Sequence, residues 1–237
     1  VMLELGRYLR KQFGAKRKIF LAASTRDGEE ALLLDALEQR LNPKALQSTD
    51  GGETGEPPAT DAKPFDRIRA NGDLLVVIVP RHPQRFSAVA NLLEQRGLAF
   101  QRRSEGRSVP EEVSVVLGDS MGEMFGYYAA SDLAFIGGSL LPFGGQNLIE
   151  ACAVGTPVLV GPHTRNFAEA TRLAIEAGAA VQVQDAEVLM RSAHHLLDDP
   201  DALSGMRLQC AEFVKFNRGA TERSLQIITA ILETAES

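Results

Sequence analysis

Cysteine is scarce in this chain of 237 residues, which contains only Cys152 and Cys210. Two cysteines in apolar, helix-like settings exclude a disulfide scaffold and a cysteine-based zinc site, and they favour a reducing cytoplasm. Long apolar runs are also missing, because residues 74–80 and 113–117 fall far below the roughly 18 residues that a membrane span needs. The net charge of −6 disfavours nucleic acid as a general partner.

Several common site signatures are absent as well. No G-x-G-x-x-G follows the first apolar run, and no G-x-x-x-x-G-K-[ST] occurs anywhere in the sequence. The NAD-dependent dehydrogenases and the P-loop nucleotidases therefore lose their main support. His194 and His195 are adjacent and would point apart on a helix, so no histidine pair has metal-binding spacing.

Short apolar, β-branched runs alternate with segments of helical periodicity along most of the chain. This pattern predicts an α/β fold, a Rossmann-like parallel sheet flanked by helices. The predicted helices include 27–41 and 83–96, each with an apolar stripe on one side. The predicted strands are 18–24, 74–80, 113–118, 132–138, 157–161 and 179–183, with a weaker one at 98–101.

Two segments depart from the alternation. Residues 42–72 are rich in proline, glycine and small polar residues, which predicts a flexible surface insertion. The sequence from Asp185 onward predicts three helical segments, with breaks near Pro200 and at 218–219. The last of them, the C-terminal helix at 220–237, carries Leu225, Ile228 and Leu232 on one stripe.

Polar and glycine residues cluster where the predicted strands end. In a parallel sheet, ligands bind outside the carboxyl ends of the strands, and glycines there let the backbone approach a ligand. Asn147 and Glu150 are three residues apart at the predicted start of a helix, where an anion is favoured. The same features have a structural interpretation, in which the glycines only form turns and Glu150 stabilises the first helical turn.

A different chemistry is also open. Gly118-Asp119-Ser120-Met121-Gly122 matches G-x-S-x-G between a predicted strand and a predicted helix, like the nucleophile elbow of α/β-hydrolases. Asp185 and His194 or His195 follow in the order of a Ser-Asp-His triad. The histidines lie inside a helical run, however, and Arg81 and Glu150 have no role in this serine hydrolase hypothesis.

Linked motifs resemble one family over most of the chain, from about residue 18 to residue 183, in the family's order and spacing. The motifs are 22–30 (AASTRDGEE), 80–83 (PRHP), 102–104 (RRS), 117–124 (LGDSMGEM), 135–150 (FIGGSLLPFGGQNLIE) and 155–163 (GTPVLVGPH). They are similar to the donor-binding half of the 3-deoxy-D-manno-octulosonic acid (Kdo) transferases. These enzymes transfer Kdo from CMP-Kdo to a lipid A precursor in lipopolysaccharide biosynthesis.

The resemblance implies the C-terminal half of a GT-B fold, two Rossmann-like halves that face each other across a cleft. Residues 1–237 would then be a single nucleotide-sugar-binding domain of an inverting glycosyltransferase. The start at Val1 fits an excised half. The general base, the acceptor groove and the membrane anchor are expected in the absent N-terminal half. The whole protein is expected at the cytoplasmic face of the inner membrane, whereas this fragment alone is expected to be soluble and inactive. No catalytic residue is therefore assigned here.

The resemblance also implies the site residues. Pro80 and Arg81 would lie at the nucleotide, with Arg81 toward the phosphate. The cytosine and ribose pocket would be lined by Met121, Gly122 and Glu123, and the phosphate and ribose would be held by Asn147, Leu148, Ile149 and Glu150. No cofactor and no metal are expected, and the partners are CMP-Kdo and, through the absent half, the lipid A precursor.

Two departures from the family pattern remain, since Arg26 stands where histidine is usual and the 42–72 insertion is long. A third hypothesis is a nucleotide-binding module with no catalysis of its own.

Overall fold

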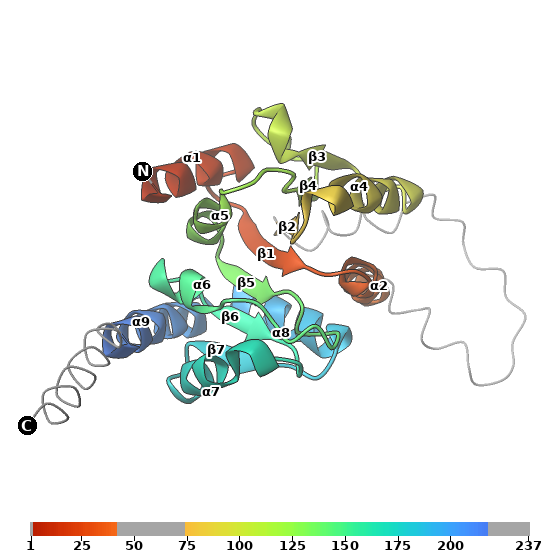
Figure 1. Cartoon of the computed structure of the whole chain (residues 1–237). Helices are drawn as coiled ribbons and strands as arrows, with labels where there is room; N and C mark the ends of the chain where they lie inside the picture. The colour runs from red at the N-terminus through yellow and green to blue at the C-terminus, as the bar shows by residue number, and fades with distance from the viewer. Residues whose placement is uncertain (1, 42–73, 218–237) are drawn as a thin grey trace, which may run out of the picture.

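Seven parallel strands form one sheet through the middle of the molecule (Figure 1). A computed structural model describes residues 2–41 and 74–217. The strands lie side by side in the order β3-β4-β2-β1-β5-β6-β7. Their bounds are β1 (Lys18–Thr25), β2 (Leu74–Pro80), β3 (Phe100–Arg102), β4 (Val115–Leu117), β5 (Leu133–Ile136), β6 (Val158–Val160) and β7 (Ala180–Gln182).

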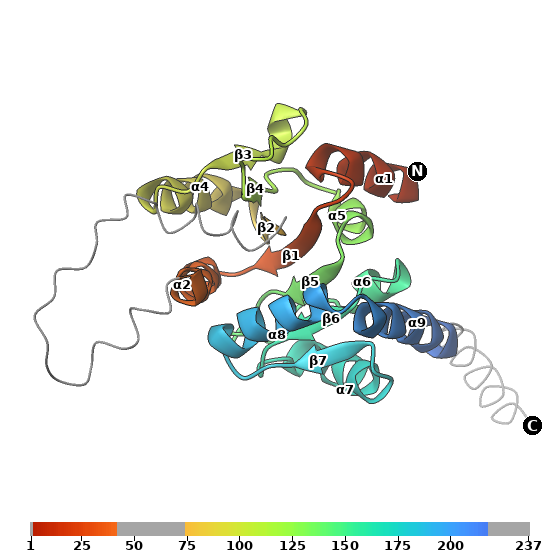
Figure 2. The same ribbon diagram turned by 180° about the vertical axis from the view of Figure 1, so that it is seen from behind.

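Helices connect the strands and cover both faces of the sheet. In Figure 1, α1, α5, α6 and α9 lie to the left and α2 and α4 to the right, and the view from behind in Figure 2 reverses them. The α-helices are α1 (Met2–Phe13), α2 (Glu29–Leu41), α4 (Phe86–Gln95), α5 (Met124–Ala130), α6 (Ile149–Ala153), α7 (Ala168–Glu176), α8 (Ala186–Asp198) and α9 (Pro200–Asn217). Three short 3₁₀ helices are η2 (Pro83–Arg85), η3 (Arg103–Glu105) and η4 (Arg165–Phe167).

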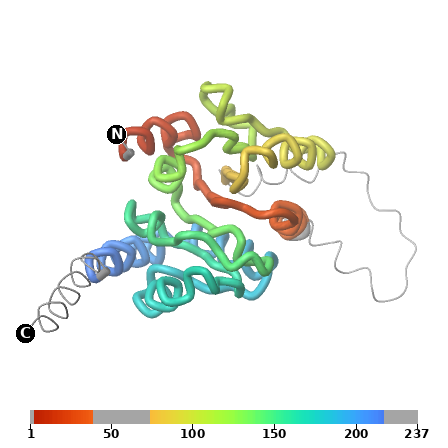
Figure 3. The backbone as a smooth tube through the Cα atoms, in the orientation of Figure 1, coloured from red at the N-terminus to blue at the C-terminus, as the bar shows by residue number. Residues whose placement is uncertain are grey.

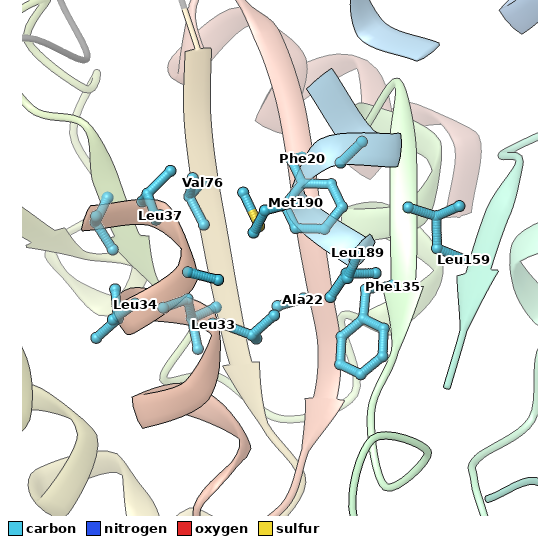
Figure 4. Close-up of a cluster of buried hydrophobic side chains, with 14 of the residues drawn as sticks. Phe20, Ala22, Leu33, Leu34, Leu37, Val76, Phe135, Leu159, Leu189 and Met190 are labelled. Carbon is cyan, nitrogen blue, oxygen red and sulfur yellow. The ribbon is translucent and has the colours of Figure 1, made fainter. Parts of the chain in front are cut away.

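Each face of the sheet has its own apolar core. On one face, side chains from α2, α4 and α8 pack against alternate residues of the strands, as Figure 4 shows for Leu33, Leu189 and Met190 around Phe20 and Phe135. On the opposite face, α1, α5, α6 and α9 supply the other cluster. Seven successive residues of β1 are buried because neighbouring strands and helices cover it on every side.

The side of β1 on which successive strands are added to the sheet changes once, between β4 and β5. Figure 3 shows β1 in the middle, with residues 74–117 on one side of it and residues 133–217 on the other. The pairs Leu21↔Val77 and Leu21↔Ala134 place β2 and β5 on opposite sides of β1. The carboxyl ends of β1 and β5 therefore form the point of order reversal at which open sheets of this kind hold ligands.

The seven predicted strands are confirmed, and the predicted and observed bounds differ only at the strand ends. The weak strand expected at 98–101 is β3, which begins two residues later. The predicted helix 83–96 begins as η2 and continues as α4. The break near Pro200 is where Asp199 Oδ1 accepts a hydrogen bond from the Ala202 amide at the start of α9.

Two predicted segments cannot be compared with the described residues. The proposed 42–72 insertion and 220–237 helix lie outside the described residues. In the described part of the chain, no helix is both long and apolar enough to span a membrane. The helix α1 was not predicted, and it packs against α5 through Leu9 and Phe13.

Candidate functional site

A cavity of about 280 Å³ opens at the carboxyl ends of the central strands. Its walls come from the segments that follow β1, β2, β4 and β5, so residues far apart in the sequence meet there. Both apolar and polar side chains line it. The described lining residues are Ser24, Val79, Pro80, Arg81, Ser120, Met121, Gly122, Glu123, Met124, Tyr127, Tyr128, Gln146, Asn147, Glu150 and Phe167.

The end of β1 has an unusual backbone. Ser24 has a φ of +54°, the left-handed region that side chains other than glycine rarely adopt, and the register with β2 shifts between Ala23 and Thr25. Beside it, a Cβ atom added to Gly137 would lie 2.4 Å from the Ser24 carbonyl oxygen. Only glycine therefore lets the segment after β5 approach β1 so closely.

A buried carboxylate fixes these two strand ends to each other. Glu29 is 0% exposed, and its two oxygens accept hydrogen bonds from the amides of Arg26 (2.8 Å), Gly138 (2.6 Å) and Leu140 (3.0 Å). Burial raises the pKa of Glu29, while the backbone hydrogen bonds from Gly138, Arg26, Leu140 and Leu141 oppose that shift. Glu29 thus positions the glycine-rich loop without reaching the cavity.

The adjacent Glu30 anchors the next loop. It is 1% exposed and accepts hydrogen bonds from Arg85 Nη1 at 2.6 Å and from Thr25 Oγ1 at 2.6 Å. This ion pair links α2 to η2, which directly follows the Pro80–Arg81 corner. The Arg81 amide donates to the Thr25 carbonyl at 3.0 Å, so the end of β2 is fastened to the end of β1.

Arg81 is the one cation among the described residues that line the cavity. Its side chain is exposed, and no ion pair occupies its guanidinium within the described parts of the chain. The charge of Arg81 acts on the Tyr128 hydroxyl, whose pKa is raised by burial and then by Glu150. A cation without a carboxylate partner at a cavity mouth can bind an anionic ligand.

The loop after β4 forms the opposite wall. Glu123 Oε2 accepts a hydrogen bond from Ser120 Oγ at 2.5 Å, and the Ser120 and Tyr127 hydroxyls are 2.8 Å apart. Met121 is 64% exposed, and Gly122 has a φ of +76° in the turn between the strand and α5. Burial raises the pKa of the Tyr127 hydroxyl.

The start of α6 supplies the third wall. Asn147 Nδ2 donates to Glu150 Oε1 at 3.1 Å, and Asn147 Oδ1 accepts from the Ile149 amide at 3.0 Å. The helix is only five residues long, so its dipole contributes less than the sequence suggested. Leu148 is 1% exposed and packs into the core, which turns its side chain away from the cavity.

The structure brings seven of the nine predicted site residues to one cavity: Pro80, Arg81, Met121, Gly122, Glu123, Asn147 and Glu150. Neither Leu148 nor Ile149 is among its lining residues. The predicted site did not include the other lining residues, which are Ser24, Val79, Ser120, Met124, Tyr127, Tyr128, Gln146 and Phe167. The three aromatic residues had no role in the prediction, and no sequence signal marks the left-handed backbone of Ser24.

The serine hydrolase hypothesis finds no support in this geometry. Ser120 is bonded to Glu123 and Tyr127, and no histidine is among the described lining residues. His194 pairs with Asp198 within α8 at 2.8 Å, and Asp185 accepts from the Val188 amide to cap the same helix. Ser120, His194 and Asp185 thus each interact with other residues and not with one another.

Within residues 2–41 and 74–217, no group of three or more His, Cys, Asp or Glu side chains is placed to hold a metal ion.

The sequence and the fold are similar to those of known proteins. No protein-family model matches the chain. The 3-deoxy-D-manno-octulosonic acid transferase of Bordetella pertussis is 42% identical over 213 residues, which is 90% of this chain and 44% of that protein. The corresponding enzyme of Haemophilus influenzae is 34% identical over 226 residues, covering 95% of this chain and 47% of that protein.

One solved structure agrees with these relatives. The C-terminal CMP-Kdo binding domain of WaaA from Acinetobacter baumannii aligns with a TM-score of 0.73 and 29% identity, over 90% of this chain and 97% of that one. This chain is a homologue of the Kdo transferases. It spans about half the length of the curated Kdo transferases that it matches. Its seven-stranded sheet has the Rossmann-like architecture of the C-terminal half of a GT-B glycosyltransferase, as predicted.

Proposed function

We propose that this chain is the donor-binding domain of an inverting Kdo transferase and that its cavity binds CMP-Kdo. One observation carries the proposal: Arg81, which has no ion-pair partner among the described residues, lines the same cavity at the carboxyl ends of the central strands as Asn147 and Glu150. A nucleoside monophosphate ester needs a cation for its phosphate and polar groups for its ribose hydroxyls, and this cavity offers both. The relatives support the same donor, because their name is Kdo transferase.

The proposed roles follow from position. Arg81 would hold the phosphate and stabilise the charge that develops on it as CMP leaves. Glu150 would accept hydrogen bonds from the ribose hydroxyls, and Asn147 would donate to the ribose. The loop at 121–123 would lie against the cytosine and the ribose. None of these roles requires a metal ion or a cofactor.

The whole reaction would need more than this chain. We propose that the acceptor, a lipid A precursor, the general base and the membrane contact at the cytoplasmic face of the inner membrane belong to the part of the relatives that this chain does not span. The described residues would then form one donor-binding domain. The chain by itself would bind CMP-Kdo without transferring the sugar.

Calorimetric titration with CMP tests the donor site. We expect CMP to bind and cytidine, which lacks the phosphate, to bind more weakly. The Arg81→Ala variant should lower the affinity for CMP by about tenfold or more, because a charge-assisted contact to the phosphate is lost. It should change the affinity for cytidine much less.

The matched control is Arg172→Ala, which removes an exposed arginine that pairs with Glu169 and Glu176 on α7, away from the cavity. CMP should bind this variant as it binds the unaltered chain. If the folded chain does not bind CMP at all, the proposed function is wrong. Transfer by a full-length Kdo transferase carrying this domain, lost on Arg81→Ala, would separate an enzyme domain from a module without catalysis.

A further inference from the structure

Three successive residues at the end of β3 and the start of η3 contact the loop that forms one wall of the cavity. Ser104 donates from its amide and its Oγ to the two carboxylate oxygens of Asp119, at 2.8 and 2.7 Å. Arg102 Nη1 lies 3.6 Å from Asp119 Oδ2, and Arg103 Nη2 donates to Glu123 Oε1 at 3.0 Å. We call residues 102–104 the clamp.

Arg103 lies behind the wall. It is not among the described residues that line the cavity, and its side chain is 14% exposed. Its guanidinium carbon lies 5.9 Å from the ring centroid of Tyr8, so α1 supports it from the other side. Because the Glu123 side chain is also only 22% exposed, this ion pair is less screened by water than a surface pair.

Both carboxylate oxygens of Glu123 already accept a hydrogen bond from a neighbouring side chain. Arg103 binds Oε1 and Ser120 binds Oε2, and Ser120 is itself in contact with the Tyr127 hydroxyl. An ionised carboxylate has about four acceptor positions, so these two bonds leave others for a ligand. Glu123 is one of the residues that line the cavity.

We propose that Arg103 is a positioning residue for the nucleotide: it fixes the carboxylate of Glu123 in the orientation that accepts hydrogen bonds from a hydroxyl or amino group of the bound CMP moiety. This inference rests on the proposed function. Arg103 acts through Glu123 and does not touch the nucleotide. Without the guanidinium, only Ser120 holds the Glu123 carboxylate, so its orientation is less firmly fixed and the ligand must fix it on binding.

A double-mutant cycle on CMP affinity tests the inference. We expect Arg103→Gln and Glu123→Gln each to weaken CMP binding by about tenfold. The variant with both substitutions should bind no more weakly than Glu123→Gln alone, because Arg103 has nothing left to position. Arg103→Lys, which keeps a cation, should recover part of the affinity lost in Arg103→Gln.

The matched control is Arg107→Gln, four residues along, where a 66% exposed arginine pairs with Glu105. It should leave CMP affinity unchanged. Two results would overturn the role of Arg103: additive losses of CMP affinity in the double variant, or full CMP affinity in both Arg103→Gln and Arg103→Lys. In either case, CMP binding by the unaltered chain would still support the proposed function. Absence of CMP binding by the unaltered chain would instead refute the proposed function itself.

Discussion

At Gly137 the packing at the end of β5 leaves no space for a side chain. A Cβ atom there would meet Ser24 O at 2.4 Å and Thr25 Cα at 2.6 Å, and backbone atoms cannot move aside as a flexible side chain can. The close approach of β1 and β5 at the edge of the cavity depends on this one residue.

We expect Gly137→Ala to lower the free energy of unfolding by about 2 kcal/mol, the usual cost of overpacking. Urea unfolding followed by circular dichroism measures it. The control is Gly205→Ala in α9, where a Cβ would meet nothing within 4 Å. That change should raise the stability by about 0.5–1 kcal/mol, because alanine is the better helix former. Equal stabilities of Gly137→Ala and the unaltered chain would contradict the packing account.

Glu29 gives a pH dependence whose sign can be worked out. Its folded pKa is raised above the ordinary carboxyl value of 4.5, with burial as the largest cause. Between 4.5 and the raised value, the folded state therefore binds more protons than the unfolded state. The contribution of Glu29 to stability is largest below 4.5 and falls as the pH rises through that window.

The Glu29→Gln variant isolates this effect. Its amide nitrogen would face one of the backbone N–H donors that the carboxylate accepts, so we expect it to be less stable by about 1–3 kcal/mol. The difference should shrink as the pH rises above 4.5, since glutamine does not titrate. Unfolding curves at several pH values between 4 and 7 measure both effects, and a difference that grows with pH would show that the direction is wrong.

Among the elements, α1 was not predicted although its sequence carries a helical stripe. Leu5, Leu9 and Phe13 recur at intervals of four residues, but the segment precedes the first strand and lies outside the alternating pattern from which the helices were predicted. In the fold, Leu9 and Phe13 are buried against α5, and the rings of Phe13 and Tyr127 stack with centroids 6.4 Å apart. A helix outside the alternating β–α pattern thus supports the cavity wall from behind.

Truncation of that contact tests the role of α1. We expect Phe13→Ala to cost about 3–5 kcal/mol of unfolding free energy, as for other buried phenylalanines. Leu3→Ala on the same helix is the control, because Leu3 is 57% exposed and should cost less than about 0.5 kcal/mol. Thermal or urea unfolding compares the two, and similar losses in both would indicate that α1 is not anchored through Phe13.

The strands were predictable because each is a short apolar run between turn residues. The bounds of β2 match the prediction, while β4, β5 and β6 are shorter than predicted. The site was predictable as a set of strand ends. The inward packing of Leu148 was not, because a linear motif does not show which of its residues faces the core.

At the scale of the whole molecule, the sheet is built from two parts of the chain that meet at β1. The order β3-β4-β2-β1-β5-β6-β7 places the cavity where they join, and the cavity takes residues from both. Sequence periodicity predicts each strand separately and does not give this order, which depends on long-range pairing.

The central position of β1 also has a consequence for synthesis on the ribosome. Ile19 at the start of β1 donates its amide to Asp132, which is 113 residues further along and directly precedes β5. At roughly 5–20 residues per second, on the order of ten seconds pass between the emergence of the two. During that time the β5 side of β1 is an unpaired apolar edge, open to association with other chains. The nascent chain is thus most exposed to aggregation at the strand that becomes the best protected in the finished fold.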